Sequence, residues 1–131
     1  MTLLTPEALA GYRRGWQERE KARRARQEAA RQAALTAARE AIFHVAGDWP
    51  SIQRVYLFGS VIQAGAFSGR SDIDVAIEGA TAEEYFGFWR ELDAALPQWF
   101  VDAREIDLPS SFADEVRRTG VLIYDREDSP A

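Results

Sequence analysis

The residues Leu57-Phe58-Gly59-Ser60 and, after a spacer, Ser71-Asp72-Ile73-Asp74-Val75 decide the fold of this chain. The first group closes a short apolar segment that begins at Arg54, which is typical of a buried strand. The second group opens another strand, expected over residues 72–77. A glycine directly after a strand lets the backbone turn sharply and lets a ligand approach closely. The serine then begins a turn or short helix, whose free N–H groups favour phosphate.

Two carboxylates flank Ile73 in the second segment. Residues two apart on a strand point to the same face, so Asp72 and Asp74 are expected together on one side while Ile73 points into the core. Adjacent carboxylates repel each other unless a cation neutralises them, and hard oxygen ligands of this kind suit Mg²⁺. A solvated polar face is the alternative, which the apolar strand disfavours. We therefore expect a metal site here.

A third acid, Asp102, stands in the apolar strand start Phe100-Val101-Asp102. If this strand pairs beside the one over residues 72–77, three carboxylates converge next to a phosphate-binding turn. A two-metal phosphoryl-transfer site requires this combination. The register of the strand is open at this point, so Glu105 and Asp107 are alternative third acids.

The surrounding segments predict an α+β fold. Thr5 and Pro6 are a typical helix start, and a helix is expected from there to about Val45. A second helix is expected to follow Thr81, and a third to follow Ser110 or Ser111. Further strands are expected at residues 100–104 and 121–124. The second helix should bury a set of four apolar side chains: Phe86, Trp89, Leu92 and Leu96.

This order of elements indicates a small mixed sheet of about four strands with helices packed on it, plus a long N-terminal helix. Residues 1–33 are expected to form a helical extension, and residues 34–131 the domain. A frayed tail is expected from Arg126 onward.

Composition narrows the functional classes. The chain has 131 residues, no cysteine and a net charge of −5, which disfavours a dedicated nucleic-acid binder. The arginine-rich run from Arg13 to Arg31 is interspersed with glutamates, which favours a solvated helix with local ion pairs over nucleic-acid contact. No apolar run approaches the roughly 20 residues that span a bilayer. We expect a cytoplasmic protein without membrane contact.

Together, the two opening segments resemble the signature of the DNA polymerase β-type nucleotidyltransferase superfamily. Within it, the chain is similar to the minimal nucleotidyltransferases, or MNT domains. The stretch from Phe100 to Tyr124 also resembles the end of that domain, so the likeness covers about residues 34–125. Two departures are a spacer about one residue longer and Gln63 at a position that is often basic, which weakens the expected grip on triphosphate.

The resemblance implies roles for six residues. The nucleotide-binding residues would be Gly59, Ser60 and Ser71. The catalytic residues, which would also hold two Mg²⁺ ions, would be Asp72, Asp74 and Asp102. The third acid would in addition help to activate the acceptor hydroxyl.

The implied activity is Mg²⁺-dependent transfer of a nucleoside monophosphate from an NTP, most simply ATP, to a hydroxyl. The acceptor would be a helical HEPN-type partner protein, in an antitoxin-like role with the long helix as a docking element. One alternative is a non-catalytic antitoxin or binding module with the same fold. Another is a transferase that acts on a small molecule such as an aminoglycoside.

Overall fold

A four-stranded mixed sheet forms the centre of the protein, whose computed structural model describes residues 4–128. The strand order is β3-β2-β1-β4. Strand β1 is antiparallel to β2 and β4, while β2 and β3 are parallel. The strands are β1 (Arg54–Phe58), β2 (Ile73–Glu78), β3 (Val101–Glu105) and β4 (Val121–Asp125).

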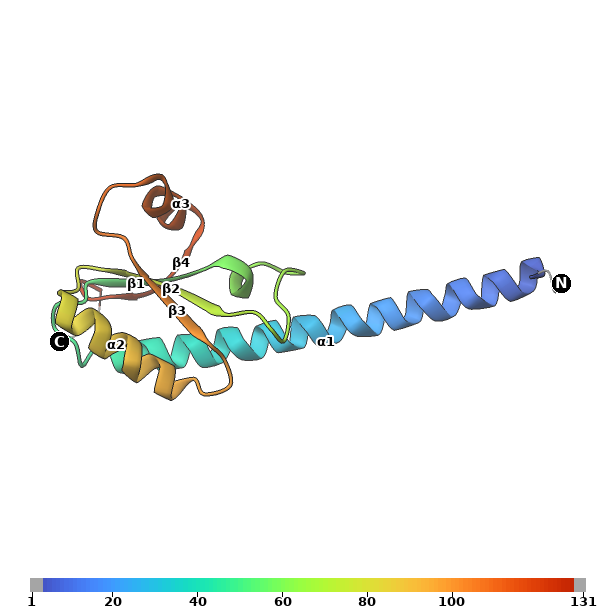
Figure 1. The fold of residues 1–131 in the computed structure, drawn as a ribbon, viewed down its shortest axis with the longest axis horizontal. Helices are drawn as coiled ribbons and strands as arrows, with labels where there is room; N and C mark the ends of the chain where they lie inside the picture. Colours follow the sequence, from blue (N-terminus) through green and yellow to red (C-terminus); the bar gives the residue numbers. More distant parts are fainter. Residues whose placement is uncertain (1–3, 129–131) are drawn as a thin grey trace.

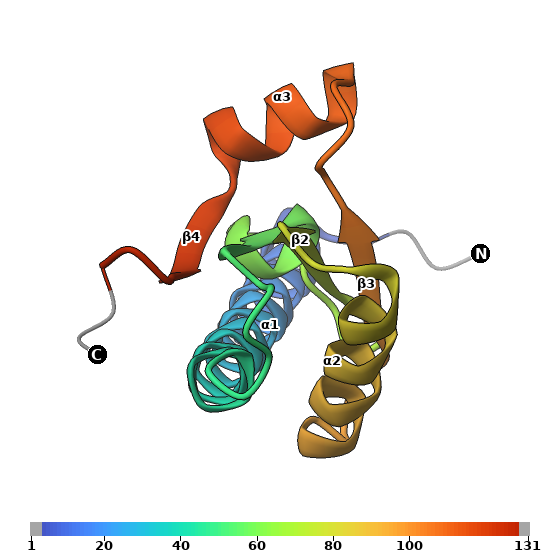
Figure 2. The ribbon, with the colours of Figure 1, turned by 90° about the vertical axis from the view of Figure 1, so that its left-hand side faces the viewer.

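Three α-helices cover the two faces of this sheet. Helices α1 (Pro6–Ala46) and α2 (Ala82–Ala95) lie against one face, and α3 (Ser111–Thr119) lies over the other (Figures 1 and 2). A short 3₁₀ helix, η1 (Gly59–Ile62), follows β1 directly. The α+β architecture and the long N-terminal helix predicted from the sequence are confirmed.

A hydroxyl side chain begins each α-helix. The oxygen atoms of Thr5, Thr81 and Ser110 accept hydrogen bonds of 3.0, 3.3 and 3.0 Å from the backbone N–H three residues later. These bonds satisfy N–H groups that have no partner in the first helical turn. Of the two serines that could begin α3, Ser110 is the cap.

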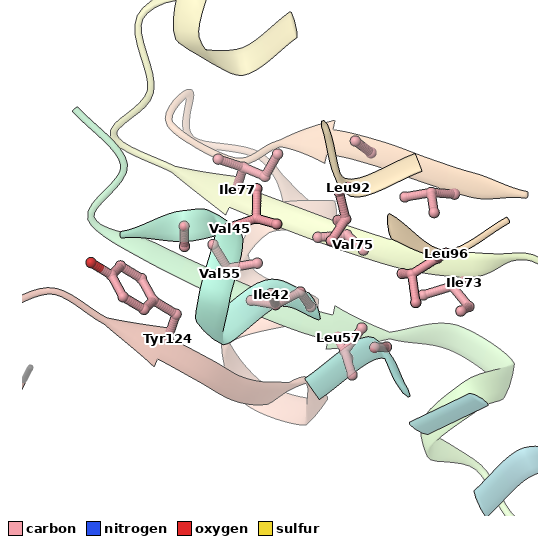
Figure 3. Close-up of a cluster of buried hydrophobic side chains, with 14 of the residues drawn as sticks. Ile42, Val45, Val55, Leu57, Ile73, Val75, Ile77, Leu92, Leu96 and Tyr124 are labelled. Carbon is pink, nitrogen blue, oxygen red and sulfur yellow. The ribbon is translucent and has the colours of Figure 1, made fainter. Parts of the chain in front are cut away.

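The main core lies between the sheet and helices α1 and α2 (Figure 3). Strand β2 contributes Ile73, Val75 and Ile77 to it, all fully buried. Because side chains alternate along a strand, Asp74, Ala76 and Glu78 point to the opposite face. Ala76 packs there in a second, smaller cluster with residues of α3.

Helix α2 corrects one prediction about which side chains are buried. Leu92 and Leu96 are buried and Trp89 is partly buried, as expected, but Phe86 is 57% exposed and Phe88 is fully buried in its place. Trp49, which lies outside the helix, sets which face of α2 turns toward the sheet.

The Trp49 ring packs so closely on Gly87 that a β-carbon there would collide with it. The Trp49 Nε1 atom also donates a 2.9 Å hydrogen bond to Glu91. These contacts hold the helix with the face of Phe88 toward the sheet.

Arg126 corrects a second prediction, that of a frayed tail. Its Nε donates to the Ile52 carbonyl at 2.7 Å, and its Nη2 donates to the carbonyls of Trp49 at 2.7 Å and Ala46 at 3.4 Å. The guanidinium also lies over the Tyr124 ring. Arg126 thus ties the end of the chain to the end of α1. Residues 129–131 of the predicted tail lie outside the described residues.

Helix α1 is much longer than the part that packs on the sheet (Figure 1). Its outermost hydrogen bonds to the rest of the molecule join Gln27 to Gly65 and Arg31 to Val61. The segment Pro6–Arg26, called the arm below, extends past the end of the sheet where β1 meets η1. A single helix crosses the boundary drawn between residues 33 and 34, so that division stays a prediction.

We expect the change Arg126→Met to lower the free energy of unfolding by about 2 kcal/mol, because it removes charged hydrogen bonds to backbone carbonyls. Urea denaturation would measure the loss. The exposed Arg90, substituted in the same way, serves as the control and should change stability by less than about 0.5 kcal/mol. Equal effects of the two changes would contradict the structural role of Arg126.

Candidate active site

The turn after β1 forms one side of the site. Gly59 has a φ of +75°, in the left-handed region that favours glycine. A β-carbon at this position would collide with the Asp74 carboxylate. The glycine is therefore required both by the backbone and by the close approach of an acid. Ser60 follows in η1, at the place where the sequence predicted a phosphate-binding turn.

The acids meet because of the strand register. Asp74 on β2 lies opposite Phe58 on β1 and opposite Asp102 on β3. Asp74 and Asp102 point to the face of the sheet that carries α3, since their neighbours Ile73 and Val101 are buried on the other face. Asp72 is exposed and stands immediately before β2, one residue outside the strand.

Asp74 has an unusual electrostatic environment. Burial raises its pKa to about 6, and the negative charges of Asp102 and then Asp72 add to this effect. Arg104 acts in the opposite direction and lowers the pKa. Three carboxylates are therefore close enough to influence one another at this end of the sheet.

Arg104 is a site residue that the sequence analysis missed. Its Nε lies 3.7 Å from the Asp102 carboxylate, and its guanidinium stacks over the Phe112 ring of α3. Phe112 in turn makes an edge contact with Phe58. The signal was available, because Arg104 is two residues after Asp102 and must share its face of the strand.

The structure also places the residues whose roles were open. Glu105 lies opposite Ile77, well along β3, and Asp107 accepts a 2.7 Å hydrogen bond from the Gly79 N–H at the far end of β2. Asp102 is therefore the acid beside Asp74. Ser71 lies in the loop before β2, where its hydroxyl accepts a 2.8 Å hydrogen bond from the Ser68 N–H. Its nucleotide-binding role stays a prediction.

A sequence comparison identifies the family. Residues 40–129 match the family described as "Polymerase beta, Nucleotidyltransferase". The chain belongs to this nucleotidyltransferase family. The match covers every strand of the sheet and all of the acids discussed above. No curated protein matches the sequence.

Solved structures of similar fold include toxin–antitoxin proteins. A structure of a toxin–antitoxin pair with AMP-PNP matches with 27% identity and a TM-score of 0.56. A mutant of a pair that contains MntA matches with 25% identity and a TM-score of 0.55. Each match covers 69% of this chain and 76% of the other. The fold is shared with the complex of a tri-AMPylated Shewanella oneidensis HEPN toxin and an MNT antitoxin. That match has 23% identity and a TM-score of 0.50, and it covers 69% of this chain and 71% of the other.

The acids of this nucleotidyltransferase suit Mg²⁺ in their chemistry. They are hard oxygen donors. A cation would relieve the repulsion from Asp102 and Asp72, which adds to the effect of burial in raising the pKa of Asp74. Within residues 4–128, no three acidic or histidine side chains stand as a preformed metal-binding group. The three aspartates would therefore have to move closer together around an ion.

Within residues 4–128, which the structure describes, the nucleotidyltransferase has no helix that is both long and apolar enough to cross a membrane. Helix α1 is long enough, but charged side chains are spread along it.

The raised pKa of Asp74 predicts how stability depends on pH. An acid whose pKa is higher in the folded state favours folding below its ordinary pKa of 3.8, and this contribution disappears as the pH rises through about 6. A pKa shift of this size corresponds to ~3 kcal/mol in the free energy of unfolding. Because Asp74 is partly exposed, we expect about 1 kcal/mol.

Asp74→Asn should therefore be more stable than the parent by about 1 kcal/mol at pH 7.5 without metal, with no difference near pH 4. Urea titrations of both proteins across this range would show it. Asp93→Asn, an exposed acid on α2, is the control and should give a constant difference. A constant difference for Asp74→Asn as well would show that Asp74 is not under this strain.

Proposed function

We propose that this chain is an NTP-dependent nucleotidyltransferase that moves a nucleoside monophosphate onto a hydroxyl of a partner protein. One observation carries the proposal: the glycine turn after β1 is packed against Asp74, and the sheet register sets Asp102 beside Asp74. A turn with free N–H groups and adjacent carboxylates are the parts that phosphoryl transfer needs.

In the proposed reaction, the acceptor oxygen forms a bond to the α-phosphorus of the NTP. The bond from that phosphorus to the oxygen bridging the α- and β-phosphates breaks, and pyrophosphate leaves with the bonding electrons. The hydroxyl proton is lost to the site. The products are a phosphodiester on the acceptor and pyrophosphate, so atoms and charges balance.

The proposed roles follow from position. Gly59 and Ser60 would bind the triphosphate at the start of η1, since the first N–H groups of a helix lack partners within it. Asp72, Asp74 and Asp102 would hold Mg²⁺, which supplies positive charge against the triphosphate and the acceptor oxygen. Asp102, on the β3 side, lies farthest from the turn. We assign it to the acceptor, whose hydroxyl proton it draws away.

We propose a HEPN-type helical protein as the acceptor. The support comes from the toxin–antitoxin relatives at 25% and 27% identity, one of them solved with AMP-PNP. AMP-PNP is an ATP analogue, which supports ATP as the nucleotide. The partner would present a hydroxyl side chain next to Asp102, at the end of the sheet where β1 meets η1.

The central test compares Asp102→Ala with Glu105→Ala in transfer of label from α-phosphate-labelled ATP to a purified HEPN-type protein. Both acids are on β3, so the pair is matched. Asp102→Ala should reduce single-turnover transfer by at least about 100-fold with little change in nucleotide affinity, because an interaction made in the transition state is lost. Glu105→Ala should transfer at the parent rate.

If the parent protein binds the HEPN-type protein stably but transfers no label, the chain is a non-catalytic antitoxin and the proposed activity is wrong. Transfer to an aminoglycoside in place of protein would overturn the acceptor class. Full activity of Asp102→Ala would remove the assigned role of Asp102.

Ser60→Ala should weaken binding of AMP-PNP by about 10- to 100-fold, the value of one hydrogen bond to a charged group at 1.5–3 kcal/mol. Calorimetric titration in the presence of Mg²⁺ would measure the change. Ser68→Ala, in the loop before β2, is the matched control and should bind as the parent does. If both variants bind normally, the phosphate site is not at this turn.

A further inference from the structure

The arm exposes a row of large apolar side chains. Leu9, Tyr12 and Trp16 are 44%, 67% and 58% exposed, and their spacing of three and four residues puts them on one side of the helix. Two aromatic rings and a leucine gathered on a solvated helix are more than scattered surface apolar residues. Such a row is typical of a surface that binds another protein.

A hollow that matches this row lies on the packed half of the same helix. It has a volume of about 420 Å³ and runs between α1 and the end of α2. Its walls include Ala37, Ala41 and His44 of α1, with Leu96, Pro97 and Trp99 opposite. Small residues on one wall and a proline and a tryptophan on the other leave room for an aromatic side chain.

The row and the hollow lie on the same side of α1. Tyr12 and Ala41 are 29 residues apart, which is about eight full turns at 3.6 residues per turn. The arm cannot reach its own hollow, because 29 residues of helix span about 43 Å. Another copy of the chain can supply an arm to it.

The lengths of the two halves of α1 also match. The arm, Pro6–Arg26, has 21 residues, and the packed half, Gln27–Ala46, has 20. Two antiparallel α1 helices that cross between residues 26 and 27 would therefore lay each arm along the whole packed half of the other. In this register Tyr12 comes opposite Ala41, Trp16 opposite Ala37, and Leu9 opposite His44.

From this match we infer that the chain forms a two-fold symmetric dimer, in which the arm of each copy docks in the hollow between α1 and α2 of the other. The inference does not depend on nucleotide transfer. Arg31 of α1 contacts Val61 of η1, and α1 leaves the sheet at that end (Figure 1). The two η1 turns would therefore lie toward the two-fold axis.

Charge supports a second copy as the occupant. The arm carries seven basic and three acidic residues, a net charge of +4, and the rest of the chain carries nine basic and 18 acidic residues, a net charge of −9. Pairing of two arms with each other would bring like charges together. Docking an arm on another copy places it on a strip of α1 with two acidic and two basic residues, within a body of net charge −9, which favours association.

The buried area is in the range of stable dimers. An arm is about 31 Å long, and a helix presents a contact strip roughly 10 Å wide. Two such strips, each counted on both surfaces, bury on the order of 1,200 Å², the lower end of specific interfaces. The two equivalent contacts form together, so neither has to be strong alone.

Light scattering of the full chain at micromolar concentration tests the dimer, with a mass of twice 14.7 kDa expected. The double change Leu9→Glu and Trp16→Glu should raise the dissociation constant by on the order of 100-fold, as loss of a central aromatic contact does. Both positions lie outside the core, so thermal unfolding should be unaffected in the monomer. Phe86→Glu, an equally exposed ring on α2, is the control and should leave the dimer intact.

Disulfide trapping tests the antiparallel register, because the chain has no cysteine of its own. The double change Tyr12→Cys and Ala41→Cys should give a covalent dimer on oxidation, since two cysteines about 43 Å apart on one rigid helix cannot bridge within the chain. Tyr12→Cys alone should not crosslink.

A parent chain that stays monomeric at 100 μM would overturn the proposal. Crosslinking by Tyr12→Cys alone would also overturn it, because the arms would then pair with each other. A dimer that survives the double glutamate change would show that the interface lies elsewhere.

Discussion

The register of β2 between its two neighbours is the constraint on which the rest of the structure depends. One face of this strand closes the core through Ile73, Val75 and Ile77, and the other carries Asp74. A slip of one residue would exchange the two faces, placing a carboxylate in the core and isoleucines in solvent. The packing that stabilises the fold therefore also sets Asp74 against Gly59 and opposite Asp102.

Two acids on the same face of β2 have different surroundings. Glu78, at the far end, has Arg54 at 3.5 Å and Arg117 at 3.8 Å from one carboxylate oxygen. The pKa of Asp74 is raised by burial and by the charges of Asp102 and Asp72, and Arg104 offsets this only in part. An acid held between two arginines contributes to structure. An acid held among other acids raises the free energy of the folded state. Such an arrangement is typical of functional sites, where a bound cation can relieve the repulsion.

Local patterns were enough to predict most elements of this fold. Hydroxyl caps, the alternation in β2 and the glycine after β1 depend on neighbouring residues, and each was found where it was expected. The strand pattern alone could not decide whether Asp102, Glu105 or Asp107 lies beside Asp74, because the pairing of Ile73 with Val101 joins strands far apart in the chain. Phe86 was placed wrongly since two adjacent stripes of α2 are apolar, and Trp49 decides between them. Arg126 was missed because its acceptors lie 74 to 80 positions earlier.

The contact between Gly59 and the Asp74 carboxylate also couples the two positions in evolution. With the Asp74 carboxylate in its present orientation, a β-carbon at position 59 would collide with it. Once the acid is replaced by a smaller residue, only the positive φ remains as a constraint, and asparagine becomes an acceptable neighbour. Loss of the glycine is therefore easier after loss of the acid than before it. A glycine without its aspartate would be the trace of a site that has lost its acid.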